Sequence, residues 1–263
     1  MSAAGGTAGP GGTGPAGMAR PGDAVPALVA SGMVRSFGAV KALAGLSFQV
    51  ERGELYGLVG ADGAGKTTAM RALTGLVPLD AGEARVLGMA PGSPRVRERI
   101  GLMPQQYSLY RDLTVSENLL FFGRLAVLPR PVFRERRDRL LSITRLARFG
   151  DRRADQLSGG MYKKLALACA LLHEPEVLLL DEPTNGVDPV SRRELWELLH
   201  GFVESGMAVV ISTPYMDEAE RCARVGLVHQ GRLLLEGRPE ALLASSGRTS
   251  FEELFVHAIA EAA

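Results

Sequence analysis

With 263 residues, of which 46% are hydrophobic and 22% charged, the chain can bury a sizeable core, so a wholly disordered protein is excluded. A net charge of +1 gives no overall bias toward nucleic acid, and two cysteines are too few for a disulfide scaffold. The longest unbroken apolar run, residues 165–172, is far shorter than the roughly 20 residues of a membrane-spanning helix, so we expect a soluble, cytosolic protein without a transmembrane segment.

The N-terminal segment, residues 1–26, differs in composition from the rest of the chain. It contains little but Gly, Ala, Pro, Ser and Thr, which cannot bury enough apolar surface to offset the entropy of ordering. It also lacks the continuous apolar stretch of a secretory signal peptide. We predict a disordered tail over 1–26 and one folded domain over 27–263.

Apolar runs and turn residues predict the elements that follow. Strands are expected at 27–34, 46–50, 54–59, 177–180 and 207–212, with a hairpin of strands at 225–229 and 233–236. Helices are expected at 66–76, 188–204 and 216–223. Strands that alternate with helices predict a doubly wound α/β sheet, with an antiparallel β-layer near its start. Between about 107 and 156 strand signals vanish and helical patterns dominate.

The charge is unevenly distributed along the chain. Residues 95–153 hold 14 Arg and 6 acidic residues, a net charge of +8. Such a segment is either a solvated helical surface or a basic face near a membrane surface or a partner's cytosolic loop. Arginine also outnumbers lysine by 26 to 4, which a genome rich in Arg codons explains most simply. The few lysines that occur despite this bias are candidates for a chemical role, and Lys66 is the foremost of them.

A glycine-rich loop follows the apolar strand that ends at residue 59. The pattern G-x-x-x-x-G-K-[ST] is fitted by Gly60, Ala61, Asp62, Gly63, Ala64, Gly65, Lys66 and Thr67. The glycines let backbone N–H groups turn toward phosphate oxygens, and the positive end of the next helix faces the anion. Lys66 reaches the β- and γ-phosphates and the Thr67 hydroxyl binds Mg²⁺. The loop therefore predicts a nucleoside triphosphate site, without separating a kinase from a GTPase or a motor.

Two acidic residues, Asp181 and Glu182, stand at the end of the apolar run 177–180. Ligands of open α/β sheets bind at the carboxyl ends of the strands. Asp181 is thus placed to hold the Mg²⁺ shell, and Glu182 can orient and polarise an attacking water.

A second anion-binding helix start is predicted at Ser158, Gly159 and Gly160, just before the longest apolar run. One chain rarely needs two such sites for one nucleotide. A simple solution is that two chains exchange them.

The order and spacing of these motifs resemble those of the ATP-binding subunits of ABC transporters, over about residues 27–257. In the resemblance, Thr68 completes the phosphate loop, Gln105 is the glutamine-loop residue, residues 186–188 are the D-loop and Phe37 is the adenine-stacking aromatic. The fold that it implies is a P-loop NTPase core of the α/β class, a doubly wound and mostly parallel sheet with an antiparallel β-layer. An all-helical subdomain over about 107–156 would be inserted between the glutamine loop and the signature motif.

The resemblance also implies a mechanism and partners. Two such domains sandwich two ATP molecules, each between one chain's phosphate loop and the other chain's signature at Ser158. Gln105 joins Thr67 and Asp181 around Mg²⁺, and Lys66, Gln105 and Glu182 are the implied catalytic residues. The helical subdomain receives the coupling helix of a membrane-spanning permease subunit.

The branch of the family is indicated by two segments. Residues 108–118 and 251–256 resemble the type-2 export branch, which moves drugs, lipids or polysaccharides outward. The expected function is therefore ATP hydrolysis that powers an exporter, from the cytoplasmic face of the plasma membrane. The sequence cannot name the cargo, because the cargo contacts lie in the permease.

The chain departs from the family pattern at three positions. Pro214 stands where a switch histidine is expected, Met161 replaces a glutamine of the signature, and Asp62 replaces an asparagine of the phosphate loop. Proline offers no side-chain donor and no backbone N–H, and losing one donor to developing charge costs about 10²–10³ in rate. These changes resemble the first cassette of exporters with two cassettes in one chain. They predict a slow ATP site here and a separately encoded second cassette with an intact histidine.

Two other function classes stay open at this point. A soluble ABC ATPase that acts on ribosomes or nucleic acid is favoured by the basic segment 95–153, although no heptad insert and no second cassette is present. A non-catalytic scaffold subunit is favoured by Pro214 and opposed by the intact Lys66, Asp181 and Glu182. Whether two copies of this chain pair, or this chain with another, is also left open.

Overall fold

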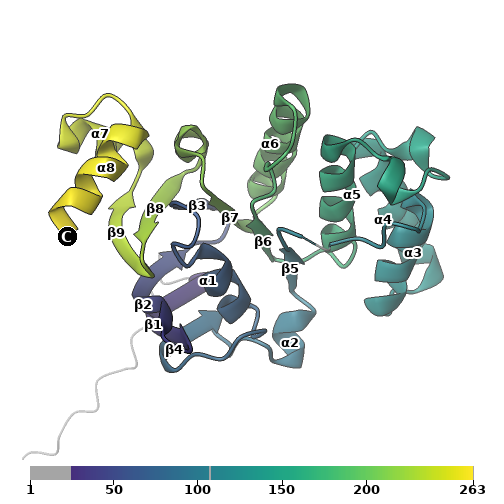
Figure 1. The fold of residues 1–263 in the computed structure, drawn as a ribbon. Helices are drawn as coiled ribbons and strands as arrows, with labels where there is room; N and C mark the ends of the chain where they lie inside the picture. The colour runs from purple at the N-terminus through teal and green to yellow at the C-terminus, as the bar shows by residue number, and fades with distance from the viewer. Residues whose placement is uncertain (1–24, 107, 263) are drawn as a thin grey trace, which may run out of the picture.

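The structure, a computed structural model, describes residues 25–106 and 108–262, and its centre is a six-stranded sheet (Figure 1). The strand order is β5-β6-β7-β3-β8-β9, all parallel except β9, which pairs antiparallel with β8. The strands span Leu55–Val59 (β3), Ile100–Met103 (β5), Val177–Asp181 (β6), Ala208–Thr213 (β7), Arg224–His229 (β8) and Arg232–Gly237 (β9). Three of them, β3, β6 and β7, are buried along their whole length, which explains their continuous apolar sequences.

A second, antiparallel sheet has the order β2-β1-β4, with strands Leu28–Phe37 (β1), Val40–Val50 (β2) and Ala81–Val86 (β4). Helix α1 (Lys66–Leu73) contacts all three of these strands and also β6 of the central sheet. It therefore lies between the two sheets, and the loop that precedes it is held by both.

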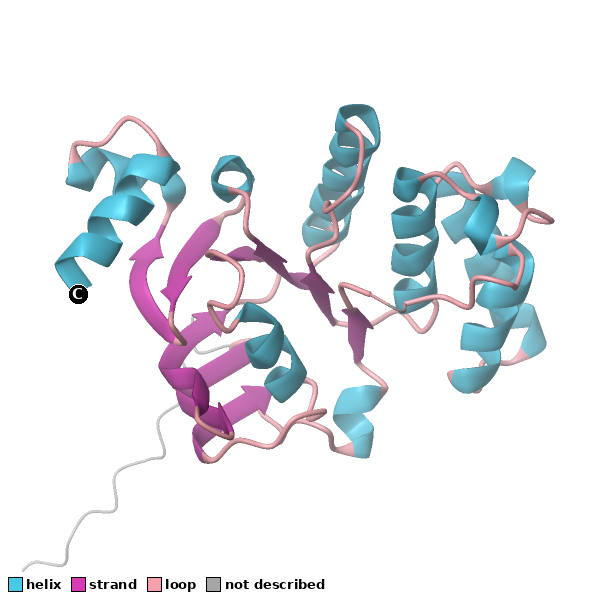
Figure 2. Ribbon diagram, in the orientation of Figure 1, coloured by secondary structure: helices cyan, strands magenta, loops and turns pink. Residues whose placement is uncertain are grey.

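Two groups of helices lie beyond the two ends of the central sheet, as Figure 2 shows. Beyond β5 lie α3 (Val115–Leu125), α4 (Arg130–Ile143) and α5 (Gly159–Leu171), with the short helices η1 (Ala147–Phe149) and η2 (Ala154–Gln156). Beyond β9 lie α7 (Pro239–Ser246) and α8 (Phe251–Ala262). The remaining helices are α2 (Pro94–Arg97), α6 (Pro189–Glu204) and η3 (Met216–Arg221).

Two apolar clusters join these layers. One surrounds α1 between the sheets and includes Met33, Tyr56 and Met70, all nearly or fully buried. The other packs α5, α6 and α8 on the opposite face of the central sheet around Trp196 and Phe251. Burial of this much apolar surface fixes the layers, and with them the loops at the carboxyl edge of the sheet.

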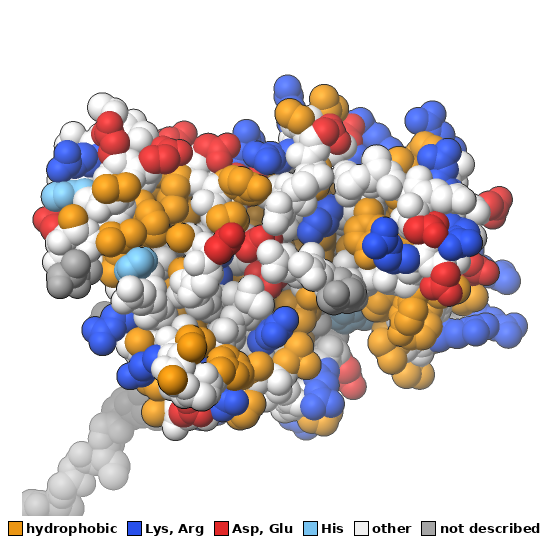
Figure 3. Space-filling model, in the orientation of Figure 1, with side chains coloured by type: hydrophobic (Ala, Val, Ile, Leu, Met, Phe, Trp, Pro, Cys, Tyr) orange, Lys and Arg blue, Asp and Glu red, His pale blue; other side chains and the backbone are white. Residues whose placement is uncertain are grey.

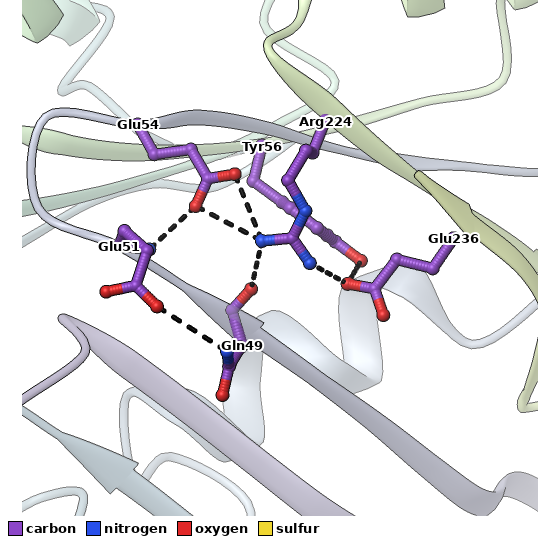
Figure 4. A network of polar contacts seen from close by, with 6 residues as sticks. All are labelled: Gln49, Glu51, Glu54, Tyr56, Arg224 and Glu236. Atoms are coloured by element: carbon purple, nitrogen blue, oxygen red, sulfur yellow. Dashed lines mark hydrogen bonds and ion pairs between the residues drawn. The ribbon is translucent and has the colours of Figure 1, made fainter. Parts of the chain in front are cut away.

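A network of polar side chains around Arg224 links the central sheet to β2 (Figure 4). The Arg224 guanidinium donates to Glu54 over 3.1 Å and to Glu236 over 2.7 Å. The Tyr56 hydroxyl donates to the same Glu236 over 2.9 Å, and burial together with Glu236 raises the pKa of Tyr56. The Arg224 guanidinium thus pairs with two carboxylates, that of Glu54 just before β3 and that of Glu236 on β9.

Both cysteines of the sequence, Cys169 on α5 and Cys222 after η3, are buried and unpaired. Burial raises the pKa of each thiol above its usual range, since a thiolate is poorly stabilised away from water.

Most of the expected elements are confirmed, with differences at their ends. Helix α1 ends at Leu73 and not near residue 76, because Gly75 adopts a left-handed φ of 75° well before Pro78. The helix expected at 216–223 is a 3₁₀ helix that ends at Arg221. Strands β4 and β5 were not predicted, nor were α2, α7 and α8. The tail prediction for 1–26 falls almost wholly on residues 1–24, outside the described residues.

Among the described residues, no helix combines the length and the apolar character that crossing a membrane requires.

Candidate active site

The glycine-rich loop over residues 60–67 joins β3 to α1 and is wrapped closely by its neighbours. A Cβ on Gly60 would lie 2.2 Å from the Val228 carbonyl oxygen, and one on Gly65 would lie 2.4 Å from that of Ala42. Gly65 also has a φ of 108°, which disfavours any side chain. Only glycine fits at both positions, so the sequence pattern has a direct steric cause.

Lys66 lies inside this loop with 4% of its surface exposed. Its ammonium donates to the carbonyl oxygens of Gly60, over 2.6 Å, and Ala61, over 3.0 Å. Burial lowers the pKa of Lys66, while the carboxylates of Glu182, Asp62 and Asp181 act in the opposite direction. The cation is therefore held at the centre of the loop, where phosphate oxygens would meet it.

The Thr67 hydroxyl donates to Asp181 Oδ1 over 3.1 Å, which joins the first turn of α1 to the end of β6. Ser212 on the neighbouring strand β7 also donates to Asp181 Oδ1. A buried carboxylate beside a hydroxyl is an oxygen donor set that fits Mg²⁺. Within the described residues, no group of three or more His, Cys, Asp or Glu side chains is arranged to hold a metal ion.

Glu182 follows Asp181 and has a left-handed φ of 49°, rare for a residue with a side chain. Its Oε2 accepts from Gln105 Nε2 over 2.6 Å and from Asn185 Nδ2 over 3.1 Å. Its backbone N–H donates to the Ser212 carbonyl over 3.1 Å. These contacts aim the buried carboxylate at the edge of the sheet where the phosphate loop lies.

A cavity of about 380 Å³ opens beside these groups. The residues that line it come from the phosphate loop, β2, the loop after β5 and the end of β6: Val40, Lys41, Ala42, Asp62, Gly63, Ala64, Gly65, Lys66, Thr67, Thr68, Gln105 and Glu182. Residues far apart in the sequence thus meet in one pocket, which holds the Lys66 ammonium, the Thr67 and Thr68 hydroxyls and the Glu182 carboxylate.

Phe37 ends β1, and 48% of its surface is exposed. It pairs with Val40, which lines the cavity, but Phe37 itself is not among the lining residues. The Arg35 guanidinium lies over the ring, 4.9 Å from its centre, in a cation–π contact. Its exposure argues against a role in the core.

Ser158 and Gly159 are exposed at the start of α5, and neither belongs to the lining of the cavity. The Ser158 hydroxyl accepts from the Met161 N–H over 3.3 Å and caps the helix. A Cβ on Gly160 would lie 2.3 Å from the Ser191 side chain, so glycine lets α5 approach the start of α6. The two predicted anion sites are therefore separate on this chain.

Two further predicted segments, residues 186–188 and the segment around Pro214, lie at the start of α6 and after β7. Asp188 caps α6 by accepting from the N–H groups of Ser191 and Val190, and the bonds from Ser191 lower the pKa of Asp188. The first N–H of the phosphate loop, on Gly60, donates to the Thr213 carbonyl over 3.2 Å. Pro214 directly follows Thr213 and is half-buried.

Three residues at this site were missed by the sequence reasoning. Ser212 could have been found from strand register, since it pairs with Asp181 across β6 and β7. Asn185 and Lys163 had no such signal. The Lys163 ammonium donates to the Glu182 carbonyl over 3.1 Å and to the Gln105 carbonyl over 3.4 Å. Burial lowers the pKa of Lys163, against the pull of Glu182 and Asp181.

Comparison with known proteins agrees with this arrangement. A family model described as ABC transporter matches residues 43–185. The chain is 47% identical over 212 residues to the probable multidrug ABC transporter ATP-binding protein YbhF of Escherichia coli, covering 80% of this chain and 37% of that protein. It is 43% identical over 224 residues to the Nod factor export ATP-binding protein I of Paraburkholderia xenovorans, covering 84% of this chain and 74% of that protein.

A solved structure described as the ATP binding subunit of an ABC transporter has a TM-score of 0.79 and 28% identity, over 88% of this chain and 99% of that one. CbiO1 of Clostridium perfringens, described as part of the ABC transporter complex cbiONQ, has a TM-score of 0.75 and 28% identity, over 84% of this chain and 92% of that one. The glycine-rich loop, the acidic pair and these likenesses all agree, and the chain belongs to the ABC transporter family, as one of its ATP-binding domains.

Proposed function

We propose that this chain binds and hydrolyses ATP to power an ABC exporter. The observation that carries the proposal is the convergence of Lys66, Thr67, Gln105 and Glu182 on one cavity at the carboxyl edge of the sheet. Asp181 is joined to this group by the hydrogen bond from Thr67. Two relatives are named for multidrug transport and for Nod factor export, which supports a role in export. The chain spans 37% of the length of the YbhF relatives.

Each residue then has a chemical role. Lys66 and the N–H groups of the loop bind the β- and γ-phosphates of ATP. Thr67, Asp181 and the Gln105 amide would hold Mg²⁺, which offsets the charge of the phosphates when bound. Glu182 orients the attacking water and accepts its proton, and the bond from Gln105 fixes the carboxylate that does so.

The site is completed by a second cassette. Ser158 and Gly159 are exposed at a helix start outside the cavity, as expected if they complete the ATP site of a facing chain. The facing chain would supply its own signature to this chain's phosphate loop. A membrane-spanning permease subunit would dock on the helical end, with the assembly at the cytoplasmic face of the plasma membrane.

We also propose that Pro214 slows ATP hydrolysis at the site built on this chain's own phosphate loop. It follows Thr213, whose carbonyl binds the phosphate loop, so it occupies a position from which a histidine could reach the γ-phosphate. Proline has no group to donate there. The second cassette would carry the intact histidine, and its site would use Ser158 and Gly160 of this chain.

The alternative, an ATPase that acts on ribosomes or nucleic acid, drew its support from the basic segment 95–153. Basic side chains do cover the helical end, interleaved with acidic and apolar ones (Figure 3). Several of the arginines pair with acids outside the segment: Arg99 with Glu176, Arg136 and Arg139 with Glu174, and Arg145 with Glu194. This partial neutralisation favours the exporter.

Turnover at different protein concentrations tests the proposal. We expect ATP hydrolysis per chain to rise with concentration, because pairing completes the sites, and to fall with Ser158→Arg, which leaves ATP binding intact. Ser142→Arg, at an exposed serine of α4, is the matched control and should change neither. Full, concentration-independent turnover by a strictly monomeric chain would overturn the proposal, as would a wild type that binds no ATP.

Pro214→His tests the slow site. In the assembled complex, hydrolysis at this chain's site should rise by up to about 10²–10³-fold, the contribution of one donor to a developing negative charge. An unchanged rate would show that Pro214 does not limit the reaction.

A further inference from the structure

We propose that Lys163 is a positioning residue that couples the exposed start of α5, at Ser158, to the Glu182 loop and the glutamine loop of the same chain. The inference rests on the proposed function, since it assigns a part in hydrolysis to a residue outside the phosphate loop. It concerns communication between the two ATP sites that one chain helps to build.

The contacts of Lys163 carry the inference. Its ammonium donates to two backbone carbonyls, those of Glu182, over 3.1 Å, and Gln105, over 3.4 Å. The side chains of the same two residues are joined by the 2.6 Å bond from Gln105 to Glu182. One cation therefore bridges, through the backbone, the two loops whose side chains meet in front of the cavity.

The Glu182 loop has a conformation that needs such support. Glu182 has a left-handed φ, which residues with a Cβ adopt only when the surroundings impose it. Its carbonyl accepts from Lys163 and also from the Asn185 N–H, over 3.3 Å. Loss of the ammonium removes one of two partners that fix the direction of this peptide, and with it the direction of the carboxylate.

Helix α5 connects the contact of Lys163 to the exposed helix start at Ser158. Ser158 caps the helix and Lys163 lies five residues further along it, about 7.5 Å along the axis. A helix moves as a rigid unit over this length. A shift of the Ser158 end, on contact with the nucleotide of the facing chain, would therefore reach Glu182 through Lys163.

The neighbouring lysine supplies a matched control. Lys164 is also on α5 and also mostly buried, but its ammonium pairs with Glu194 on α6, and Glu194 has a second partner in Arg145. Removing Lys164 deletes a buried cation from the same helix without touching the Glu182 loop. The two lysines thus separate positioning of the catalytic loop from general stability of α5.

The experiment compares Lys163→Met, Lys163→Arg and Lys164→Met in the full-length chain. Hydrogen exchange of the amides in residues 182–187 is measured without nucleotide, and single-turnover ATP hydrolysis is measured as a function of ATP concentration. We expect Lys163→Met to speed exchange at Asn185 and Val187. We also expect it to lower the rate of hydrolysis by about 10–10²-fold, as a small misplacement of a catalytic group does, with less than about a 2-fold change in half-saturating ATP.

The other two variants make the result specific. Lys164→Met should leave both measurements near wild type, and Lys163→Arg, which keeps the cation and its donors, should recover part of the rate and of the exchange protection. Equal behaviour of Lys163→Met and Lys164→Met would overturn the inference. The exchange measurement needs no ATP. A wild type that hydrolyses no ATP would therefore contradict the proposed function, while hydrogen exchange would still test the contact of Lys163 with the Glu182 loop.

Discussion

The Gln105 side chain donates a 2.6 Å hydrogen bond to the Glu182 carboxylate, which joins two loops 77 residues apart in the sequence. The bond lies at the carboxyl edge of β5 and β6, where parallel strands bring distant residues together. It makes the orientation of the proposed catalytic carboxylate depend on the loop that leads into the helical end of the molecule.

Gln105→Glu should therefore impair hydrolysis more than ATP binding. The new carboxylate would repel Glu182 at hydrogen-bond distance and displace it, and a displacement of this kind costs about 10–10² in rate. Single-turnover hydrolysis and ATP affinity, measured together, separate the two effects. Gln106→Glu, at the exposed neighbouring position, is the control for added charge. A rate equal to that of the control would mean that the bond does not matter.

Gly160→Ala should destabilise the chain by about 1–3 kcal/mol, since its Cβ would lie 2.3 Å from the Ser191 side chain and force α5 away from α6. Urea unfolding measures the loss, and Ser191→Gly in the same chain should recover most of it. Gly201→Ala is the opposite case: nothing lies within 4 Å of its Cβ, and a gain of about 0.5–1 kcal/mol is expected in the helix. A double variant as unstable as Gly160→Ala alone would show that Ser191 is not the obstacle.

Arg224→Met should destabilise the chain by about 2–4 kcal/mol, because it leaves the 8%-exposed Glu54 and the half-buried Glu236 without their shared cation. Adding Glu54→Gln should restore part of the loss. Arg85→Met breaks an exposed pair with Glu83 and should cost no more than about 0.5 kcal/mol. Thermal or urea unfolding distinguishes the two arginines, and equal losses would contradict the role given to the network in Figure 4.

His173 should make stability fall below about pH 6.5. Burial lowers the pKa of His173, so the unfolded chain takes up a proton first as the pH falls, and stability present at higher pH is lost. One such group contributes a slope of at most about 1.4 kcal/mol per pH unit. Urea unfolding between pH 7.5 and 5.5 should give a smaller slope for His173→Gln, which can keep a bond to the Ile100 carbonyl. His257→Gln, on α8, is the surface control, and equal slopes for all three chains would refute the assignment.

The sequence predicted the elements whose residues are buried on both faces or capped by strong signals. The runs at β3, β6 and β7 are continuous because both faces are covered, and Asp188 with Pro189 marks the start of α6. The strand β4 was missed because only Ala84 and Val86 of its six residues are buried, at the edge of a sheet. The strand β5 has four residues, too few for a periodic pattern.

The sequence predicted those residues of the site that belong to contiguous motifs. The phosphate loop and the acidic pair are contiguous in sequence, and their chemistry follows from residue type and order. The partners of Lys163 and Asn185 are brought near only by the fold, by the packing of α5 for Lys163 and by the turn after Glu182 for Asn185. No spacing rule indicates such contacts before the fold is known.

The burial of both cysteines has a practical consequence for following the assembly. Neither Cys169 nor Cys222 offers an accessible thiolate, so the wild-type chain should take up little maleimide while it is folded. A fluorophore could then be attached at one chosen position, such as Ser142→Cys on α4, without first replacing the native thiols. Energy transfer between labelled copies, or to a labelled companion cassette, would report in real time on whether nucleotide draws the two halves together.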